Sequence, residues 1–348
     1  MIKPVFLLCS ERSGSNLLRM IIGNHPQISA PSFIGLLSLF YPLLPNYGNL
    51  QNEHNFRRLC TDVCNVMENQ YGIWRSTFLD DELFNSVTDR SFFGLYDYII
   101  EKEIITRRKQ RAFIKESGQY SFLLLDHYKD SKFIYLLRDG RDVALSFKNS
   151  PTHTGNIKEI ANIWSKEQQE CLSFYCLDGK ERTYAVHYED LLRYPEKTSK
   201  NICAFLDEPY EPAILEYYKN KESIEISAKT VNWENVKKPI FANNFGKYKN
   251  DLSSSSIKYF EKIAFRELFL CGYKLEYDLS ELKSGKNFTN YIRKAITLLQ
   301  KTIKGKFPYL SELKSRKKFF QTTSNISCFR PQVSKPILHC EAVDDKTE

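Results

Sequence analysis

The stretch Pro4-Val-Phe-Leu-Leu-Cys-Ser-Glu-Arg-Ser-Gly-Ser-Asn-Leu-Leu-Arg19 decides the fold of this 348-residue chain. Residues 5–8 form an uninterrupted apolar run, which is typical of a buried parallel strand. Residues 9–16 are mostly polar and include one glycine. The apolar residues that follow have helical spacing, at Leu17, Leu18, Ile21 and Ile22. The pattern therefore predicts a strand, a polar loop and a helix in that order.

The loop of this first unit has the composition of an anion site. A helix start leaves backbone N–H groups without intrahelical partners, and the helix dipole is positive there, which suits a phosphate or a sulfate. Arg12 adds a fixed positive charge, and short side-chain donors stand at Ser13, Ser15 and Asn16. The alternative is an ordinary strand-to-helix turn capped by Ser13 or Ser15, and this stretch alone leaves both open.

A second unit of the same kind lies in the middle of the chain. Residues 132–137 predict a buried strand, Arg138-Asp-Gly-Arg-Asp142 a turn, and residues 143–148 the start of a helix. Further strands are predicted at 113–118, which runs into a loop, and at 184–187. Strands that alternate with helices favour an α/β fold with a P-loop-like central parallel sheet, flanked by helices on both faces. Sites in such folds lie at the carboxyl ends of the strands.

The other segments are expected to surround this sheet. Helices are predicted for most of residues 52–110 and again at 120–125, 157–178, 196–206 and 253–271. Residues 27–50 predict a loop and a short helix over the site. Residues 223–250 are polar and aromatic without a clear period, and they predict a long functional loop.

The basic charge is concentrated near the C-terminus. The formal net charge is +8, but residues 281–318 hold eleven Lys or Arg against two Glu, so the remainder is close to neutral and does not indicate nucleic-acid binding. We divide the chain into a main domain at 1–279, a basic amphipathic helical extension at 280–320 and a flexible tail at 321–348. The helix at 286–306 could lie on an anionic membrane or meet an acidic partner. We favour the alternative, a helix docked on the main domain.

The composition is that of a soluble globular protein, with 42% hydrophobic and 26% charged residues. The nine cysteines are scattered, with no C-x-x-C pair, which favours isolated core thiols in a reducing compartment over a zinc site or a disulfide framework. No signal peptide is evident, and the apolar run at 33–44 is too short to span a bilayer. We therefore expect a cytoplasmic protein, membrane-peripheral if the 286–306 helix binds lipid.

Four stretches together resemble the sulfotransferase superfamily that uses 3'-phosphoadenosine-5'-phosphosulfate (PAPS). Glu11-Arg-Ser-Gly-Ser-Asn-Leu-Leu18 is similar to its 5'-phosphosulfate loop, and Ile134-Tyr-Leu-Leu-Arg-Asp-Gly-Arg-Asp-Val-Ala-Leu-Ser-Phe147 to its 3'-phosphate strand-turn-helix. His187-Tyr-Glu-Asp-Leu-Leu-Arg-Tyr-Pro-Glu196 and Gly246-Lys-Tyr-Lys-Asn250 resemble its tyrosine-glutamate-aspartate segment and its cofactor-covering loop. The four stretches occur in the same order as in the family. The residues of the first two are more similar to the tyrosylprotein, carbohydrate and bacterial tailoring branches than to the cytosolic phenol and steroid branch.

The resemblance implies a transfer of the sulfuryl group from PAPS to an acceptor hydroxyl or amine by in-line displacement. The product is adenosine 3',5'-bisphosphate (PAP), and no metal is required. Negative charge builds on the departing 5'-phosphate, and Arg12 and backbone N–H groups would neutralise it. The implied residues of this loop are Arg12, Ser13, Gly14, Ser15, Asn16 and Leu17. Lys115 stands where the family carries a catalytic lysine, which would reach the leaving oxygen or the sulfuryl group.

The resemblance also implies residues for the other end of the nucleotide. Arg138 and Ser146 would hold the 3'-phosphate, Arg138 through charge-assisted hydrogen bonds. Lys247 and Lys249 would cover it from the late loop, and Tyr188 would approach the adenine edge. The alternatives are plain turn chemistry, solvated lysines and a buried core tyrosine.

Two departures from the family pattern concern the chemistry. Asn16 stands where a hydroxyl residue is usual in the phosphosulfate loop, although its amide can still donate. Many relatives carry a glutamate shortly after a position equivalent to Pro26, as the base for the acceptor proton, but residues 30–35 contain neither a carboxylate nor an imidazole. The base is therefore unassigned, with Glu116 and His153 as the candidates.

Other classes of function remain to be weighed against a sulfotransferase. A P-loop nucleotide kinase needs G-x-x-x-x-G-K-[ST], and the first loop has a single glycine and no lysine at the helix start. A catalytically degenerate nucleotide-binding protein would keep the site and lack the base. The acceptor that the resemblance implies carries a hydroxyl or an amine, and the basic extension favours a glycan or a glycolipid.

Overall fold

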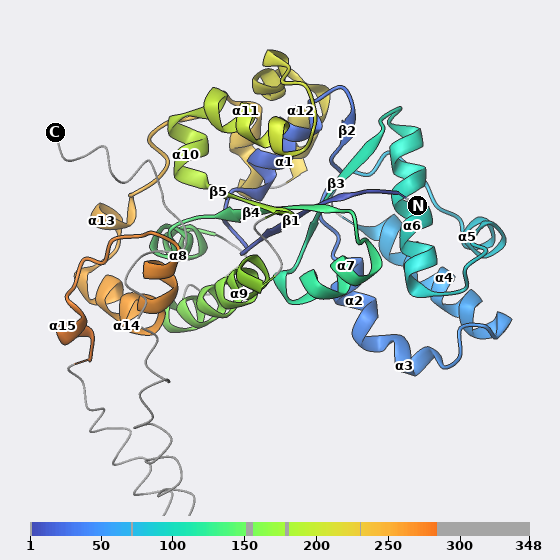
Figure 1. The fold of residues 1–348 in the computed structure, drawn as a ribbon, viewed down its shortest axis with the longest axis horizontal. Helices are drawn as coiled ribbons and strands as arrows, with labels where there is room; N and C mark the ends of the chain where they lie inside the picture. The colour runs from blue at the N-terminus through green and yellow to red at the C-terminus, as the bar shows by residue number, and fades with distance from the viewer. Residues whose placement is uncertain (1, 71, 151–155, 178–180, 230, 284–348) are drawn as a thin grey trace, which may run out of the picture.

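A computed structural model describes residues 2–70, 72–150, 156–177, 181–229 and 231–283. Within these residues five parallel strands form one sheet, in the order β2-β3-β1-β4-β5 (Figure 1). The strands are β1 Val5–Cys9, β2 Ile28–Ser29, β3 Arg111–Glu116, β4 Lys132–Leu137 and β5 Thr183–His187. The chain crosses from one side of β1 to the other between β3 and β4. Such a switch point is where ligands bind in open α/β sheets.

The central strand β1 is buried on both faces because its side chains alternate between two hydrophobic cores. Phe6 and Leu8 belong to one core, whereas Val5, Leu7 and Cys9 belong to the other. The register pairs Leu8 with Glu116 of β3 and with Tyr135 of β4. The carboxyl ends of β1, β3 and β4 therefore meet at one edge of the sheet.

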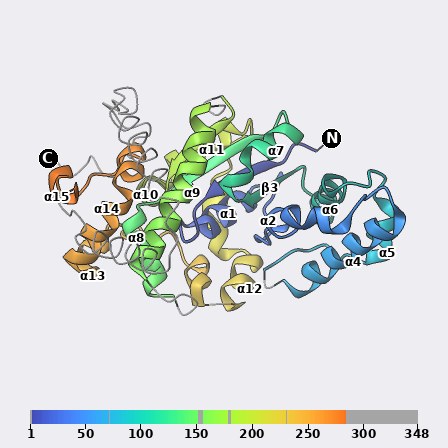
Figure 2. The ribbon, with the colours of Figure 1, turned by 90° about the horizontal axis from the view of Figure 1, so that it is seen from below.

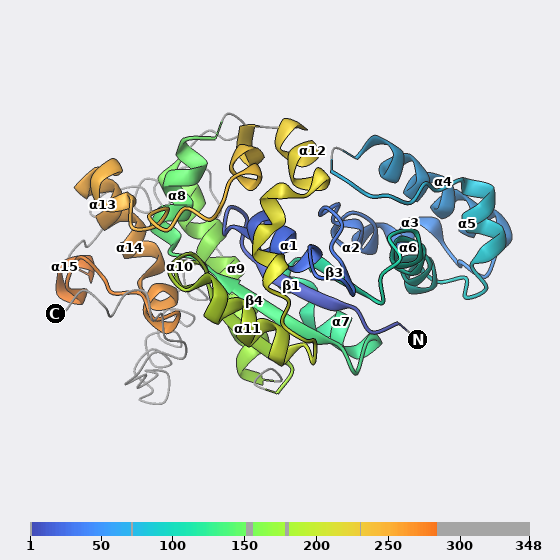
Figure 3. The same cartoon turned by 90° about the horizontal axis from the view of Figure 1, so that it is seen from above.

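Helices cover both faces of the sheet, as predicted. The core on one face is completed by residues from α1, α10, α11 and α12, and the core on the other by residues from α4, α6, α7, α8, α9 and α14. Figures 2 and 3 show these two faces from below and from above. The first group comprises α1 Ser15–Gly23, α10 Tyr188–Arg193, α11 Pro195–Phe205 and α12 Lys221–Lys229. The second comprises α4 Glu53–Asn69, α6 Phe92–Thr106, α7 Ser121–His127, α8 Gly140–Lys148, α9 Ile157–Leu177 and α14 Ser254–Leu270.

Shorter elements join these helices. They are α2 Leu36–Phe40, α3 Leu44–Tyr47, α5 Asp80–Ser86, α13 Tyr248–Asp251 and α15 Leu279–Lys283, with 3-10 turns η1 Tyr41–Leu43, η2 Gly118–Tyr120, η3 Pro212–Lys219 and η4 Val231–Lys237. The prediction of a long loop at 223–250 is wrong over much of that range, because α12, η4 and α13 lie within it or overlap it. α12 buries only a few residues, such as Ile226, and the Ser223 hydroxyl donates to Tyr217 O at 2.6 Å. Tertiary packing therefore stabilises a helix that has little periodic pattern of its own.

Several predictions concern residues outside the described part of the chain. Of the predicted extension at 280–320, only residues 280–283, within α15, are described, so the helix at 286–306 and the tail at 321–348 stay predictions. Seven cysteines are described as free thiols, and all except Cys176 are buried. No helix among the described residues is long and apolar enough to cross a membrane.

Candidate functional site

The loop between β1 and α1 turns sharply at the carboxyl edge of the sheet. Gly14 is the N-cap of α1 with φ +89°, and Arg12 also has a positive φ, of +65°. A positive φ costs a residue with a Cβ on the order of 1–3 kcal/mol, and such strain clusters at functional sites. The Ser10 and Ser13 hydroxyls lie 2.5 Å apart beneath the turn. This geometry places the first N–H groups of α1 at the sheet edge, as an anion site requires.

The Tyr188 ring packs directly on this loop. A Cβ added to Gly14 would lie 2.3 Å from Tyr188 Cε2, so only glycine fits beneath the ring. The Arg138 guanidinium lies 4.5 Å from the centroid of the same ring, and Asn244 Nδ2 donates to the Tyr188 hydroxyl at 2.9 Å. Tyr188 therefore joins the first loop, the turn after β4 and the late loop.

Gly14→Ala is expected to destabilise the fold more than Gly246→Ala. Both positions have positive φ, which costs alanine about 1–2 kcal/mol, but a Cβ at Gly246 meets no atom within 4 Å. The Gly14 variant must also displace Tyr188, an overpacking cost of roughly 1–3 kcal/mol. Urea unfolding of the two variants measures the difference in the free energy of unfolding. Equal losses would show that the contact between Gly14 and Tyr188 is unimportant.

The turn after β4 is hydrogen-bonded to the first loop. Arg138 Nη1 donates to the backbone oxygen of Arg12 at 2.9 Å, and Arg12 Nε donates to Ser146 Oγ at 3.1 Å. Arg138 Nη2 also donates to Asn244 O at 3.4 Å, whereas the buried Arg138 Nε has no partner among the described residues. The loop before α1 and the turn before α8 thus lie side by side.

The two guanidinium groups also interact electrostatically. Burial lowers the pKa of Arg12, the carboxylate of Glu11 offsets part of this effect, and the positive charge of Arg138 lowers the pKa further. Like charges held this close are costly when the site is empty. An anion bound beside both groups relieves that cost, so the arrangement favours a phosphorylated ligand.

The late loop is fixed to the start of α8 by Asp142. Its carboxylate accepts hydrogen bonds from the backbone N–H groups of Gly246 at 2.5 Å and Tyr248 at 2.9 Å. Burial and the neighbouring Asp139 raise the pKa of Asp142, although Arg138 and the two N–H groups oppose the shift. Asp142 therefore holds residues 243–248 against the turn that carries Arg138.

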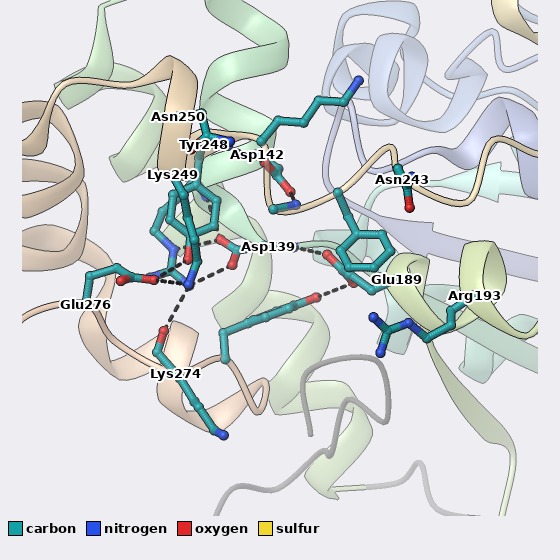
Figure 4. A pocket seen from close by; sticks show the side chains of 15 residues that line it. Asp139, Asp142, Glu189, Arg193, Asn243, Tyr248, Lys249, Asn250, Lys274 and Glu276 are labelled. Carbon is teal, nitrogen blue, oxygen red and sulfur yellow. Dashed lines mark hydrogen bonds and ion pairs between the residues drawn. The ribbon is translucent and has the colours of Figure 1, made fainter. Parts of the chain in front are cut away.

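A pocket of about 500 Å³ opens beside this loop (Figure 4). Lys247 and Lys249 line it, but Arg138 and Ser146 do not. Lys249 Nζ pairs with Glu276 at 2.8 Å, and Lys247 is exposed. The structure thus places both lysines at this pocket, and Lys249 is held there by Glu276.

Two charged residues of the same region have structural partners. Arg141 is 2% exposed and forms ion pairs with Asp139 at 2.7 Å and Glu261 at 2.5 Å. Glu189 accepts hydrogen bonds from Asp139 N at 3.0 Å and the Tyr273 hydroxyl at 3.1 Å, and burial raises the pKa of Glu189 to about 8. Figure 4 shows the Asp139 and Glu189 side chains among those that line the pocket. These contacts fix the backbone of the turn around Arg138.

Lys115, near the carboxyl end of β3, reaches the first loop. Its Nζ donates to Ser15 Oγ at 3.3 Å and lies 4.9 Å from the centroid of the Phe33 ring. A positive charge therefore lies at the start of α1. Phe33 belongs to the 27–50 segment, which the sequence predicts to cover the site.

The two predicted base candidates are placed differently. Glu116 is 2% exposed, and its Oε1 accepts a hydrogen bond from the Tyr96 hydroxyl at 2.6 Å. Burial raises the pKa of Glu116 to about 7. Its side chain leaves β3 on the face opposite Lys115, because neighbours on a strand alternate. His153 lies outside the described residues, so neither assignment is tested.

Two residues near the site, Asp142 and Asn244, are missed by sequence reasoning. Asp142 could have been found, because a carboxylate in the first turn of a helix after a conspicuous turn is a candidate loop anchor. Asn244 comes to the site from a segment far away in sequence, and no local pattern marks it.

Comparison of the sequence with known proteins points to one family. The sequence model of a family described as "Sulfotransferase family" matches residues 4–212. The chain is 25% identical over 150 residues to a protein-tyrosine sulfotransferase of Drosophila melanogaster. The aligned region covers 40% of this chain and 30% of that protein. It is 25% identical over 218 residues to protein-tyrosine sulfotransferase 1 of Danio rerio, covering 61% of this chain and 55% of that protein. The chain thus spans about a third to a half of the length of these relatives.

Solved structures share the fold. The sulfotransferase domain of the Synechococcus PCC 7002 olefin synthase superposes with a TM-score of 0.51 at 24% identity, covering 76% of this chain and 96% of that domain. The sulfotransferase domain of the curacin biosynthetic pathway superposes with a TM-score of 0.52 at 21% identity, and the superposition covers 79% of this chain and 99% of that domain. Because the family match extends over more than half of the sequence and includes both helix starts of the site, the chain belongs to the sulfotransferase family.

Proposed function

We propose that the chain transfers the sulfuryl group of PAPS to a hydroxyl-bearing acceptor. The observation that carries this proposal is the hydrogen bond from Arg138 Nη1 to Arg12 O at 2.9 Å. It joins the loop suited to the 5' end of the nucleotide to the turn suited to its 3'-phosphate. A doubly phosphorylated adenosine is a ligand of the charge and extent that two such anion sites side by side would take.

The residues present fit such a donor. Arg138 has a buried Nε without a partner among the described residues, and Gly14 allows the Tyr188 ring to pack against the loop that starts α1. PAPS, when bound, supplies the activated sulfuryl group. Arg12 and the N–H groups at the start of α1 would bind the 5' end, and Arg138 and Ser146 the 3'-phosphate. Lys115 would hold positive charge where the leaving oxygen becomes negative.

The acceptor is proposed to approach from the side of Phe33. The Lys115 Nζ lies 4.9 Å from the centroid of this ring. An aromatic ring beside the ammonium group suits a phenol, a sugar ring or an apolar alcohol. A tyrosyl hydroxyl is a further candidate acceptor, because two relatives are named protein-tyrosine sulfotransferases. A glycan or glycolipid stays a prediction that rests on residues 286–306.

Calorimetric titration tests the nucleotide assignment. The chain is expected to bind PAP without magnesium and to release it as ionic strength rises, because fixed guanidinium and ammonium groups provide the binding. ATP with magnesium is the control ligand. Binding of ATP with magnesium alone would favour a nucleotide kinase. PAP binding without transfer of labelled sulfate from PAPS to any member of a phenol, sugar and alcohol panel would favour a degenerate binding protein.

A further inference from the structure

Asn244 of the late loop contacts two side chains that lie beside the proposed nucleotide site. Its Nδ2 donates to the Tyr188 hydroxyl at 2.9 Å, and its backbone oxygen accepts a hydrogen bond from Arg138 Nη2 at 3.4 Å. The Tyr188 ring packs on Gly14 at the start of α1, and the Arg138 guanidinium lies 4.5 Å from the centroid of the same ring. Asn244 therefore lies where the first loop, the turn after β4 and the late loop meet.

The backbone that carries Asn244 is held on both sides of this residue. Arg138 binds the oxygen of Asn244 itself, and the Asp142 carboxylate accepts hydrogen bonds from the backbone N–H groups of Gly246 and Tyr248, a few residues further along the loop. The Asn244 side chain is partly buried and is itself bonded to a buried tyrosine. A group that is already held in place loses less conformational entropy when a ligand binds to it.

The Asn244 carboxamide has hydrogen-bonding groups to spare. A carboxamide carries two N–H donors and one oxygen acceptor, and the Tyr188 hydroxyl takes one of the two N–H groups. Within the part of the chain that the structure describes, the second N–H and Oδ1 form no hydrogen bond. One donor and one acceptor on a single planar group are thus left for a ligand.

The nucleobase is the part of the proposed ligand that needs such a pair. The 5' and 3' phosphates of PAP are carried by one ribose, so a ligand that reaches both the start of α1 and Arg138 has its ribose between them. The base projects from that ribose, and Asn244 touches Arg138 and the ring that packs on the first loop. Adenine presents an amine donor beside a ring-nitrogen acceptor, and asparagine binds this pair with both ends of its amide.

We propose that Asn244 binds the nucleobase of the sulfuryl donor and selects adenine over guanine, an assignment that rests on the proposed function. Its Oδ1 accepts a hydrogen bond from the N6 amine of adenine, and its second N–H donates to a ring nitrogen. Guanine carries an oxygen in place of this amine, so Oδ1 would face another acceptor. The Tyr188 hydroxyl, by holding one N–H, determines which way the amide is turned.

Calorimetric titration with PAP and with guanosine 3',5'-bisphosphate tests this selection. The wild type is expected to bind PAP about 10- to 100-fold more tightly, the discrimination of one bidentate amide–base pair. In Asn244→Asp the carboxylate only accepts hydrogen bonds, so it loses the bond to the adenine ring nitrogen and can accept from the N–H groups of guanine. The ratio of the two affinities is expected to fall at least about 10-fold. The added negative charge weakens the binding of both nucleotides alike and cancels in the ratio.

Asn243→Asp is the matched control. Asn243 is the exposed neighbour in the same loop and lines the pocket of Figure 4, so its replacement adds the same charge and should keep the wild-type ratio. Asn244→Ala removes the amide without adding charge, and it should bind the two nucleotides with similar affinity. This variant provides a second measurement of the ratio if the aspartate disturbs the loop.

Three results overturn the role of Asn244: equal affinity of the wild type for both nucleotides, an unchanged ratio in both Asn244 variants, or tighter PAP binding by Asn244→Ala. The last would show that the contacts of Asn244 close the site instead of reading the base. Transfer of labelled sulfate from PAPS tests the proposed function separately. A chain that selects PAP through Asn244 and transfers no sulfate overturns the proposed function alone, and a chain that binds neither nucleotide overturns both.

Discussion

Lys115→Met is expected to lower the rate of sulfuryl transfer roughly 100- to 1,000-fold, the usual cost of removing one group that stabilises developing charge. The Lys115 ammonium lies 3.3 Å from Ser15 Oγ at the start of α1, where the departing 5'-phosphate of the proposed reaction would gain negative charge. Methionine keeps an unbranched stem beside Phe33 and removes only the charge. Because the charge acts mainly in the transition state, kcat should fall while PAP affinity changes little.

Single-turnover transfer from labelled PAPS and calorimetry with PAP measure the two effects. Lys262→Met is the control. Lys262 is exposed on α14, and its replacement removes the same charge outside the loop. A Lys115 variant with full activity would contradict the proposed role and favour a binding protein. A fall in PAP affinity as large as the fall in rate would instead make Lys115 a residue of nucleotide binding.

The elements that carry both helix starts were predictable because their sequence signals are local. The apolar run of β1 and the polar loop after it predicted the strand, turn and helix to within two residues, since α1 begins at Ser15 rather than Leu17. The same holds for β4 and the Arg138 turn, although α8 begins at Gly140, three residues early. In each case burial in a parallel sheet requires a pattern that stands out in the sequence.

The parts that sequence reasoning missed depend on contacts between distant segments. β2 is two residues long and is defined by pairing with Arg111 and Ala112, which no local pattern announces. Glu116 stays a predicted base candidate. The alternation of β3 turns its carboxylate towards Tyr96, a contact with a distant segment that no local pattern shows.

Arg138→Ala is expected to weaken PAP binding about 10- to 100-fold, which corresponds to the roughly 1.5–3 kcal/mol of a hydrogen bond to a charged group. Arg138 is proposed to hold the 3'-phosphate, but it also donates to Arg12 O at 2.9 Å and packs on Tyr188. Its loss could therefore act through the ligand or through the loop. Calorimetry with two nucleotides, PAP and adenosine 5'-monophosphate, distinguishes these effects, because the second lacks the 3'-phosphate.

If Arg138 binds the 3'-phosphate, the variant should lose affinity for PAP and bind adenosine 5'-monophosphate almost as the wild type does. Arg266→Ala, at an exposed position of α14, controls for the change in net charge and should bind both nucleotides normally. An equal loss for both nucleotides would assign Arg138 to the support of the first loop and leave the 3'-phosphate without its proposed partner. Arg138→Lys refines the result: lysine keeps the charge but not the planar fork, so affinity for PAP restored only in part indicates that two guanidinium nitrogens bind the phosphate together.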